Sequence, residues 1–448
     1  MKGHGDLHLL TRFAGRAGYA LALRVLWALV SFAGAASLAR WFSARDYGQY
    51  ATIISLITFL SVVCALGAPN ALVRMLAEFG GDHPTGEKAA LAHGALRATH
   101  IGALVASIAA ALLLAGGALV LHATHQISDP LIYVAGAAML PAFTLTDVQA
   151  AAGRSYGRIF SALAPKDVVW RFLLIPLAWG VTRFLPAQTQ LNAFLMLAAL
   201  SLTILSLAQA WTLRQAVPQA VLAAKPIYSL SHLARISTST WITQVASAVF
   251  RSLDVVIAGW FLPLREVGLY FAASRVAALI SFVLSSTNLI VGPEVAKLHH
   301  SGAQTQLIRM LKLASIIVFL PSLAAFLACI LFPEHVLSLF GHGFVDARIE
   351  LIILAVGQLI NAATGCVGIV LMMTGLERKN AEVLVSSSVI TVIAMIVLTR
   401  AFGPVGTAVA TSGGFALWNV RLWLVARRHT AYDPSILGLF RTQAASTS

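Results

Sequence analysis

Long apolar stretches, each followed by a short polar connector, run along the whole of this 448-residue sequence. A bilayer core about 30 Å thick needs roughly 20 apolar residues of helix, and twelve stretches approach that length. They are expected at residues 18–39, 48–68, 100–121, 131–151, 167–185, 190–212, 239–261, 270–292, 312–333, 350–373, 383–400 and 404–426. The connectors hold turn residues such as Pro69-Asn70 and Gly403-Pro404. The pattern predicts an all-α polytopic membrane protein of about twelve transmembrane helices.

The composition excludes the main alternatives to a membrane protein. Hydrophobic residues make up 58% of the chain and charged residues only 11%, whereas soluble proteins carry about 25% charged residues. So few charges could not cover a water-facing surface of this size, which excludes a soluble enzyme. The same hydrophobicity excludes a disordered chain. The stretches are also too long, and alternate too little, for the strands of a barrel.

The basic residues are distributed unequally between the two sets of connectors. The chain has 31 Lys and Arg against 17 Asp and Glu, a formal charge of +14. If the N-terminus is cytoplasmic, 20 of the 31 fall in inside segments, among them Arg154, Arg158 and Lys166, and 6 fall outside. Cytoplasmic loops carry an excess of Lys and Arg. Both termini are therefore expected in the cytoplasm, and a nucleic-acid partner is not needed to explain the charge.

The first apolar stretch differs from a cleaved signal peptide. Lys2, Arg12 and Arg16 precede it, as in a signal sequence. Its run of about 22 apolar residues exceeds the 7–15 of a signal peptide, so we expect an uncleaved first helix.

A pattern of aromatic, acidic and glycine residues occurs twice, about 220 residues apart. Each copy links the first and second stretch of a six-stretch half. Six spans per half give both halves one orientation, as in transporters built from parallel repeats. The alternative is a coincidence of common residues. The two copies are Trp41-Phe42, Asp46, Gly48 and Tyr50, and Trp260-Phe261, Glu266, Gly268 and Tyr270.

The repeat predicts two six-helix bundles related by a parallel pseudo-repeat. The expected domains are an N-terminal bundle at 1–213, a cytoplasmic linker at 214–238, a C-terminal bundle at 239–430 and a cytoplasmic tail at 431–448. The polar chain from Asp433 onward is expected to be disordered or loosely attached.

Motifs of catalysis and metal binding are missing from the sequence. There is no P-loop, paired-carboxylate motif or nucleophile elbow, and no connector is long enough for an active-site domain. His83, His93 and the His299-His300 pair are expected in solvated connectors. Cys64, Cys329 and Cys366 lie in predicted helices without ligand spacing. We therefore expect no enzyme, no catalytic residues, no cofactor and no metal site.

Six charged residues inside predicted spans are candidate site residues, because a charge at the centre of a span costs about 2.5–3.5 kcal/mol on insertion scales. Each could snorkel or form a salt bridge between helices. If they line one cavity, that cavity holds four Arg and two Asp. The planar guanidinium group of arginine can bind a phosphate or diphosphate through paired hydrogen bonds. Arg24, Asp147 and Arg171 are expected near the cytoplasmic side, and Arg251, Asp254 and Arg275 near the outer side.

Four ordered stretches carry a resemblance to a known family. They run from Leu38 to Arg74, from Gln149 to Arg158, from Asp254 to Arg275 and from Leu339 to Gly406. Together they resemble the polysaccharide (O-antigen type) flippases of the multidrug/oligosaccharidyl-lipid/polysaccharide exporter superfamily. Those flippases typically have Asp followed by a basic residue in span 7. This chain has Asp254-Val255 instead, which weakens any role assigned to that pair.

The resemblance implies a lipid-linked oligosaccharide flippase without its own ATPase. Its two bundles would open alternately to move an oligosaccharide on polyprenyl (undecaprenyl) diphosphate across a bacterial inner membrane. The setting would be surface polysaccharide, such as lipopolysaccharide, with other polysaccharide-assembly proteins as partners. Arg24, Arg251 and Arg275 would bind the substrate, and Asp147, Asp254 and Arg171 would act in gating or ion coupling. The alternatives are a cation-coupled multidrug exporter, which the Arg excess disfavours, and a membrane-embedded glycosyl-transfer enzyme.

Overall fold

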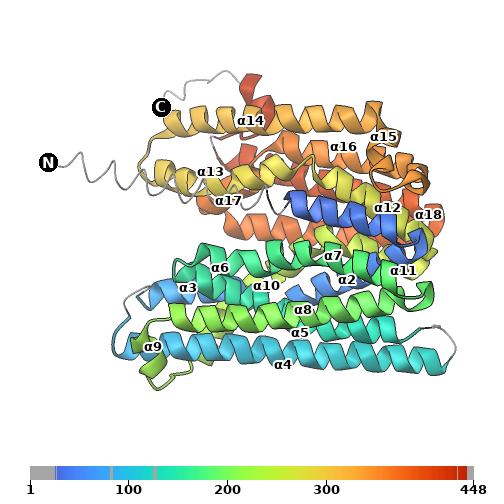
Figure 1. Cartoon of the computed structure of the whole chain (residues 1–448). Coiled ribbons are helices and arrows are strands. Elements are labelled where there is room, and N and C mark those ends of the chain that lie inside the picture. Colours follow the sequence, from blue (N-terminus) through green and yellow to red (C-terminus); the bar gives the residue numbers. More distant parts are fainter. Residues whose placement is uncertain (1–25, 27, 81–83, 125–128, 431, 441–448) are drawn as a thin grey trace. The chain divides into compact units, whose positions relative to one another are not determined.

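The computed structural model describes residues 26, 28–80, 84–124, 129–430 and 432–440, and within these residues it contains helices and no strands (Figure 1). Their contacts divide the chain into two compact units, Val25–Val256 and a second unit that contains Ile257–Ser448. We call these the N-terminal and the C-terminal unit. The domain limits drawn from the sequence stay a prediction.

The N-terminal unit is built around α5, which packs against α2, α3, α4 and α8 (Figure 1). Residues 28–41 also form a helix. The unit contains α2 (Ala44–Cys64), α3 (Ala68–Glu78), α4 (Glu87–Ala123), α5 (Leu131–Ser155), α6 (Ile159–Ala164), the π-helix η1 (Pro165–Trp170), α7 (Arg171–Phe184), α8 (Ala187–Ala216), α9 (Gln219–Ala223), α10 (Leu230–Ala248) and the π-helix η2 (Val249–Leu253). Helix α11 (Asp254–Phe261) then runs into the C-terminal unit.

The C-terminal unit is organised around α16, which packs against α12, α14 and α18. Helix α18 is interrupted at Gly403, where the backbone has φ 61° and ψ −142°. This break separates the two spans predicted at 383–400 and 404–426. The elements are α12 (Leu264–Ala278), α13 (Phe282–His300), α14 (Gln304–Leu331), α15 (Pro333–Ser338), the 3-10 helix η3 (His342–Ala347), α16 (Arg348–Thr364), α17 (Val367–Met373), α18 (Glu377–His429) and the 3-10 helix η4 (Ile436–Phe440).

The length and hydropathy of these helices are those of a multi-pass membrane protein. Among the described residues, eight helical segments can span a bilayer, or nine if the bent pair Leu264–Ala278 and Phe282–Asn288 is one span. The all-α membrane fold is thus confirmed. The number twelve stays a prediction.

Both copies of the sequence repeat begin a helix at corresponding positions. Helix α2 begins at Ala44 and α12 at Leu264, and each has an acidic residue in its first turn, where it complements the helix dipole. The tyrosine of each copy is buried and contacts a long helix of its own unit. The Tyr50 ring lies 5.8 Å from that of Phe194 in α8, and Tyr270 Oη lies 3.0 Å from Thr411 Oγ1 in α18. This correspondence favours a structural repeat over coincidence.

The segment after α8 folds back onto α4. His93 Nδ1 donates a hydrogen bond to the Ala224 carbonyl at 2.7 Å, and Ile227 N donates to the Ala90 carbonyl at 3.0 Å. A Cβ at Gly94 would lie only 1.9 Å from the Ile227 carbonyl oxygen. His93 is thus buried on a helix, and its expected place in a solvated connector is wrong, because this returning segment covers it.

Residues 432–440 fold back onto the C-terminal unit, as the segment after α8 folds back onto the N-terminal unit. We call residues 432–440 the strap. Ser315 Oγ of α14 donates to the Pro434 carbonyl at 2.7 Å. Asp433 Oδ1 accepts hydrogen bonds from Trp423 Nε1 at 3.0 Å and Ser435 Oγ at 2.6 Å. For these residues the expectation of a loosely attached tail is wrong, because a polar composition does not reveal that the polar groups are used within the unit.

The strap predicts a difference between two glycine variants. Gly365 and Gly375 both have positive φ, 64° and 81°, so alanine should strain either backbone by about 1 kcal/mol. Only at Gly365 would a Cβ lie 2.1 Å from the Pro434 carbonyl oxygen, whereas at Gly375 nothing lies within 4 Å. Overpacking should therefore add about 1–3 kcal/mol at Gly365. We expect Gly365→Ala to lower the apparent melting temperature in detergent clearly more than Gly375→Ala. Equal shifts would show that the strap does not stabilise the unit.

Candidate functional site

Two π-helical turns lie between α-helices of the N-terminal unit, and both carry charged residues. Turn η1 contains Lys166 and Asp167, and turn η2 contains Arg251. A π turn breaks the regular hydrogen-bond ladder of an α-helix and is frequently found at functional sites. The two turns are therefore the starting point for a candidate site.

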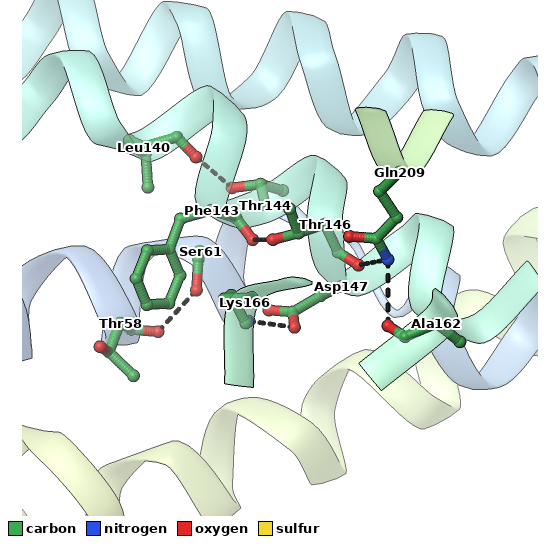
Figure 2. A network of polar contacts seen from close by, with 10 residues as sticks. All are labelled: Thr58, Ser61, Leu140, Phe143, Thr144, Thr146, Asp147, Ala162, Lys166 and Gln209. Carbon is green, nitrogen blue, oxygen red and sulfur yellow. Dashed lines mark hydrogen bonds and ion pairs between the residues drawn. The ribbon is translucent and has the colours of Figure 1, made fainter. Parts of the chain in front are cut away.

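An ion pair joins η1 to α5. Lys166 Nζ contacts Asp147 Oδ1, and the two side chains are 14% and 34% exposed (Figure 2). The same ammonium lies 4.5 Å from the centroid of the Phe143 ring, within the range of a cation–π interaction. Phe143 and Asp147 are four residues apart on α5 and so share one face of it. One helix face thus supplies both an anion and an aromatic ring to the ammonium.

Helix α8 holds η1 on both sides. Before the turn, Gln209 Nε2 donates to the Ala162 carbonyl at 3.0 Å and to the Thr146 carbonyl of α5 at 3.3 Å (Figure 2). At the end of the turn, Trp170 Nε1 donates to the Ala198 carbonyl at 3.0 Å. Gln209 and Trp170 are each 2% exposed. These contacts fix where Lys166 lies relative to Asp147.

Two arginines lie within electrostatic range of the same carboxylate. Asp147 attracts the guanidinium groups of both Arg251 and Arg154, and Arg154 is attracted by Asp167 as well. We call Lys166, Arg154 and Arg251 the cationic cluster. The sequence placed Asp147 and Arg251 near opposite sides of the membrane. The structure brings them close enough to interact.

The other predicted site residues have different surroundings. Arg171 is partly buried and begins α7 directly after η1, and Asp254 is 5% exposed at the start of α11. Arg275 belongs to the C-terminal unit, where its guanidinium lies 4.6 Å from the Phe271 ring centroid. Arg24 lies outside the described residues. The roles predicted for these four residues stay predictions.

Sequence reasoning missed Lys166, Phe143 and Gln209. Lys166 was counted with the inside connector because it stands one residue before an apolar stretch. The Pro165-Lys166-Asp167 sequence was a usable signal, since a proline followed by two charges at the edge of a span indicates an irregular helix. Nothing in the sequence marks Phe143 or Gln209 among the many apolar and polar residues of these helices.

The cluster is suited to anion binding. An ammonium, two guanidinium groups and an aromatic ring can hold an anionic headgroup, and arginine binds phosphate oxygens in pairs. Among the described residues, no group of three His, Cys, Asp or Glu side chains could hold a metal ion.

Comparison with known proteins places the fold among membrane transporters. No family model matches the chain. A probable low-salt glycan biosynthesis flippase, Agl15 of Haloferax volcanii, is 27% identical over 180 residues, which are 40% of this chain and 38% of that protein. The match therefore spans well under half of that relative.

Solved structures are similar over nearly the whole chain. The lipid II flippase MurJ in an inward closed conformation has a TM-score of 0.71 at 14% identity, covering 92% of this chain and 87% of that one. An inward-facing multidrug resistance MATE transporter of the MOP superfamily has a TM-score of 0.64 at 15% identity, covering 95% and 96%. The chain has the fold of these transporters, which agrees with the superfamily resemblance in its sequence. The O-antigen subtype stays a prediction.

The role of Gln209 predicts a contrast with a second glutamine of α8. Gln190 Nε2 also donates to two main-chain carbonyls, those of Thr182 and Leu185, but in a more exposed setting. Gln209→Ala leaves two buried carbonyls without their partner and should cost about 1–3 kcal/mol. Gln190→Ala should cost about 0.5 kcal/mol or less. Thermal unfolding in detergent compares the two variants, and a similar loss in both would contradict a special role of Gln209 at η1.

Proposed function

We propose that this chain is a flippase for an oligosaccharide carried on a polyprenyl diphosphate, working by alternating access. The observation that carries the proposal is the cationic cluster beside Asp147. Arg154 and Arg251 lie in helices long and apolar enough to span a membrane, and Lys166 of η1 contacts Asp147 of such a helix. Charges at such positions are costly and mark substrate or ion pathways. The name of the partial relative and the likeness to MurJ support the same activity.

The chemistry of the cluster favours a diphosphate over other headgroups. Charge-assisted hydrogen bonds from Arg and Lys to phosphate are roughly twice as strong as neutral ones. A diphosphate offers several such acceptors, so it can engage Arg251 and its neighbours together. An uncharged headgroup would offer the cations no charge-assisted hydrogen bond, and a cationic one would be repelled. Substrate charge also lets the membrane potential bias transport, by about 2.3 kcal/mol per charge and 100 mV.

The predicted site residues enter the proposal as follows. Arg24 captures the diphosphate from the cytoplasmic side, and Arg251 and Arg275 receive it in the outward state. Asp254 modulates the outer residues. Asp147 and Arg171 act in gating or ion coupling. The protein has its place in a bacterial inner membrane, among other polysaccharide-assembly proteins.

A cation-coupled multidrug exporter is the second candidate, and the likeness to MATE transporters favours it. That function needs acidic and aromatic groups for organic cations, whereas here Asp147 and Phe143 already contact the ammonium of Lys166. A drug-resistance assay separates the two functions. Resistance to an organic cation without movement of lipid diphosphates would support the multidrug exporter and overturn the flippase proposal. The named relatives are flippases and transporters, which leaves a glycosyl-transfer enzyme without support.

The proposed orientation predicts which introduced thiols react from outside the cell. Cys64, Cys329 and Cys366 are buried, so they leave a low background. Both Lys88 and His342 are exposed in the structure, but we place Lys88 on the cytoplasmic side and His342 on the outer side. A membrane-impermeant maleimide should label His342→Cys in intact cells and Lys88→Cys only after permeabilisation. The reverse pattern would place the termini outside.

The flippase proposal predicts a loss of transport when an arginine of the cationic cluster is replaced by alanine. Hydrogen bonds to charged groups contribute about 1.5–3 kcal/mol, so Arg251→Ala should lower the transport rate roughly ten- to hundredfold. Arg378, whose side chain is 92% exposed and paired with Glu382, gives the control Arg378→Ala, which should keep its rate. The measurement is leaflet-resolved transport of a lipid-linked diphosphate oligosaccharide in vesicles. Full rates in both Arg24→Ala and Arg251→Ala would end the proposal.

A further inference from the structure

We propose that Lys166 binds the substrate diphosphate and that Asp147 is its internal counter-anion, which the substrate displaces and which later displaces the substrate. This inference rests on the proposed function and assigns a binding residue that the sequence had placed in a connector. It also defines the gating role of Asp147 as competition for one ammonium.

The first argument is the burial of Lys166. Its side chain is 14% exposed and contacts Asp147 of α5, a helix long and apolar enough to span a membrane, and a buried ammonium without a counter-charge is strongly unfavourable. Some anion must therefore accompany Lys166 in every state of the protein. In the structure that anion is the Asp147 carboxylate.

The second argument is that Lys166 stays in place when its anion is exchanged. The Phe143 ring lies 4.5 Å from the ammonium and needs no carboxylate to attract it. Gln209 of α8 binds the backbone just before η1 (Figure 2), and Trp170 at the end of η1 binds the backbone of α8. Lys166 is thus a preorganised cation, which reduces the entropy lost when a ligand binds.

The third argument is that Asp147 has other partners to which it can move. Its side chain is 34% exposed, more than twice the exposure of Lys166. The charges of Arg154 and Arg251 attract it as well, and Arg154 is itself exposed. When a phosphate takes its place on Lys166, Asp147 can turn toward these guanidinium groups or toward water. It therefore does not become a stranded charge.

The exchange explains how a high-affinity cluster could release its cargo. An intramolecular anion that occupies the ammonium lowers the apparent affinity for substrate in proportion to the fraction of time that it is bound. The same carboxylate reoccupies the ammonium as the phosphate leaves. Removing Asp147 should therefore tighten binding and slow turnover, whereas a purely structural ion pair would lose stability and gain no affinity.

The test is a titration of the detergent-solubilised full-length protein with farnesyl diphosphate, a short polyprenyl diphosphate without sugar. If Asp147 occupies Lys166 at least nine-tenths of the time, Asp147→Asn should bind this probe about tenfold tighter. Lys166→Ala should bind it about tenfold more weakly, and Lys166→Arg should retain most of the affinity. When Asp147→Asn is combined with Lys166→Ala, it should no longer increase the affinity for farnesyl diphosphate. Arg378→Ala should bind like the wild type.

Two results would overturn the inference. One is an Asp147→Asn variant that melts cooperatively but binds farnesyl diphosphate no tighter than the wild type. The other is a folded Lys166→Ala variant with unchanged affinity. Thermal unfolding of each variant separates these results from misfolding, and Lys166→Arg, which keeps the charge, remains informative if Lys166→Ala does not fold.

Transport distinguishes this inference from the proposed function. If the wild type binds farnesyl diphosphate with the expected order of variants but moves no lipid-linked diphosphate in vesicles, the flippase proposal fails and the exchange at Lys166 stands. If vesicles show transport but the order of affinities is absent, the exchange fails and the flippase proposal stands. Asp147→Asn should also transport more slowly than the wild type at saturating substrate.

Discussion

A charge within an apolar helical bundle requires a counter-charge, and the N-terminal unit is arranged around this requirement. Lys166 is satisfied by Asp147 and by the Phe143 ring, both presented by one face of α5. Helix α8 then supports η1 on both sides, through Gln209 and Trp170. The central packing of α5 against α8 is therefore also what positions the ammonium. Stability and electrostatics in this unit depend on the same contacts.

The second organising feature is the repetition of local contacts in the two units. In each unit a helix begins after a short break, has an acidic first turn, and buries a tyrosine that contacts a long helix of the same unit. Such agreement between distant segments favours a repeat in the packing, not in composition alone. Gly48 and Gly268 are buried at matching positions as well.

Much of the architecture could be predicted from the sequence, because long apolar runs have few ways to satisfy their backbone in a membrane. The limits of α5 and α8 lie within a few residues of their predicted spans. The π turns could not be predicted, because their register depends on contacts such as those of Gln209 with α6. Lys166 was misplaced for the same reason: a charge at the edge of an apolar run does not reveal whether a neighbouring helix supplies its partner. The strap at 432–440 was missed because the polar groups that hold it come from distant helices.

The two returning segments make each unit self-sufficient in one respect. The segment after α8 returns to α4 through His93, and the segment after α18 returns to α14 through Ser315. The first lies between α8 and α10 within the N-terminal unit, and the second ends the described residues. Each unit thus covers a long helix with a segment of its own, and this contact needs no residue of the other unit.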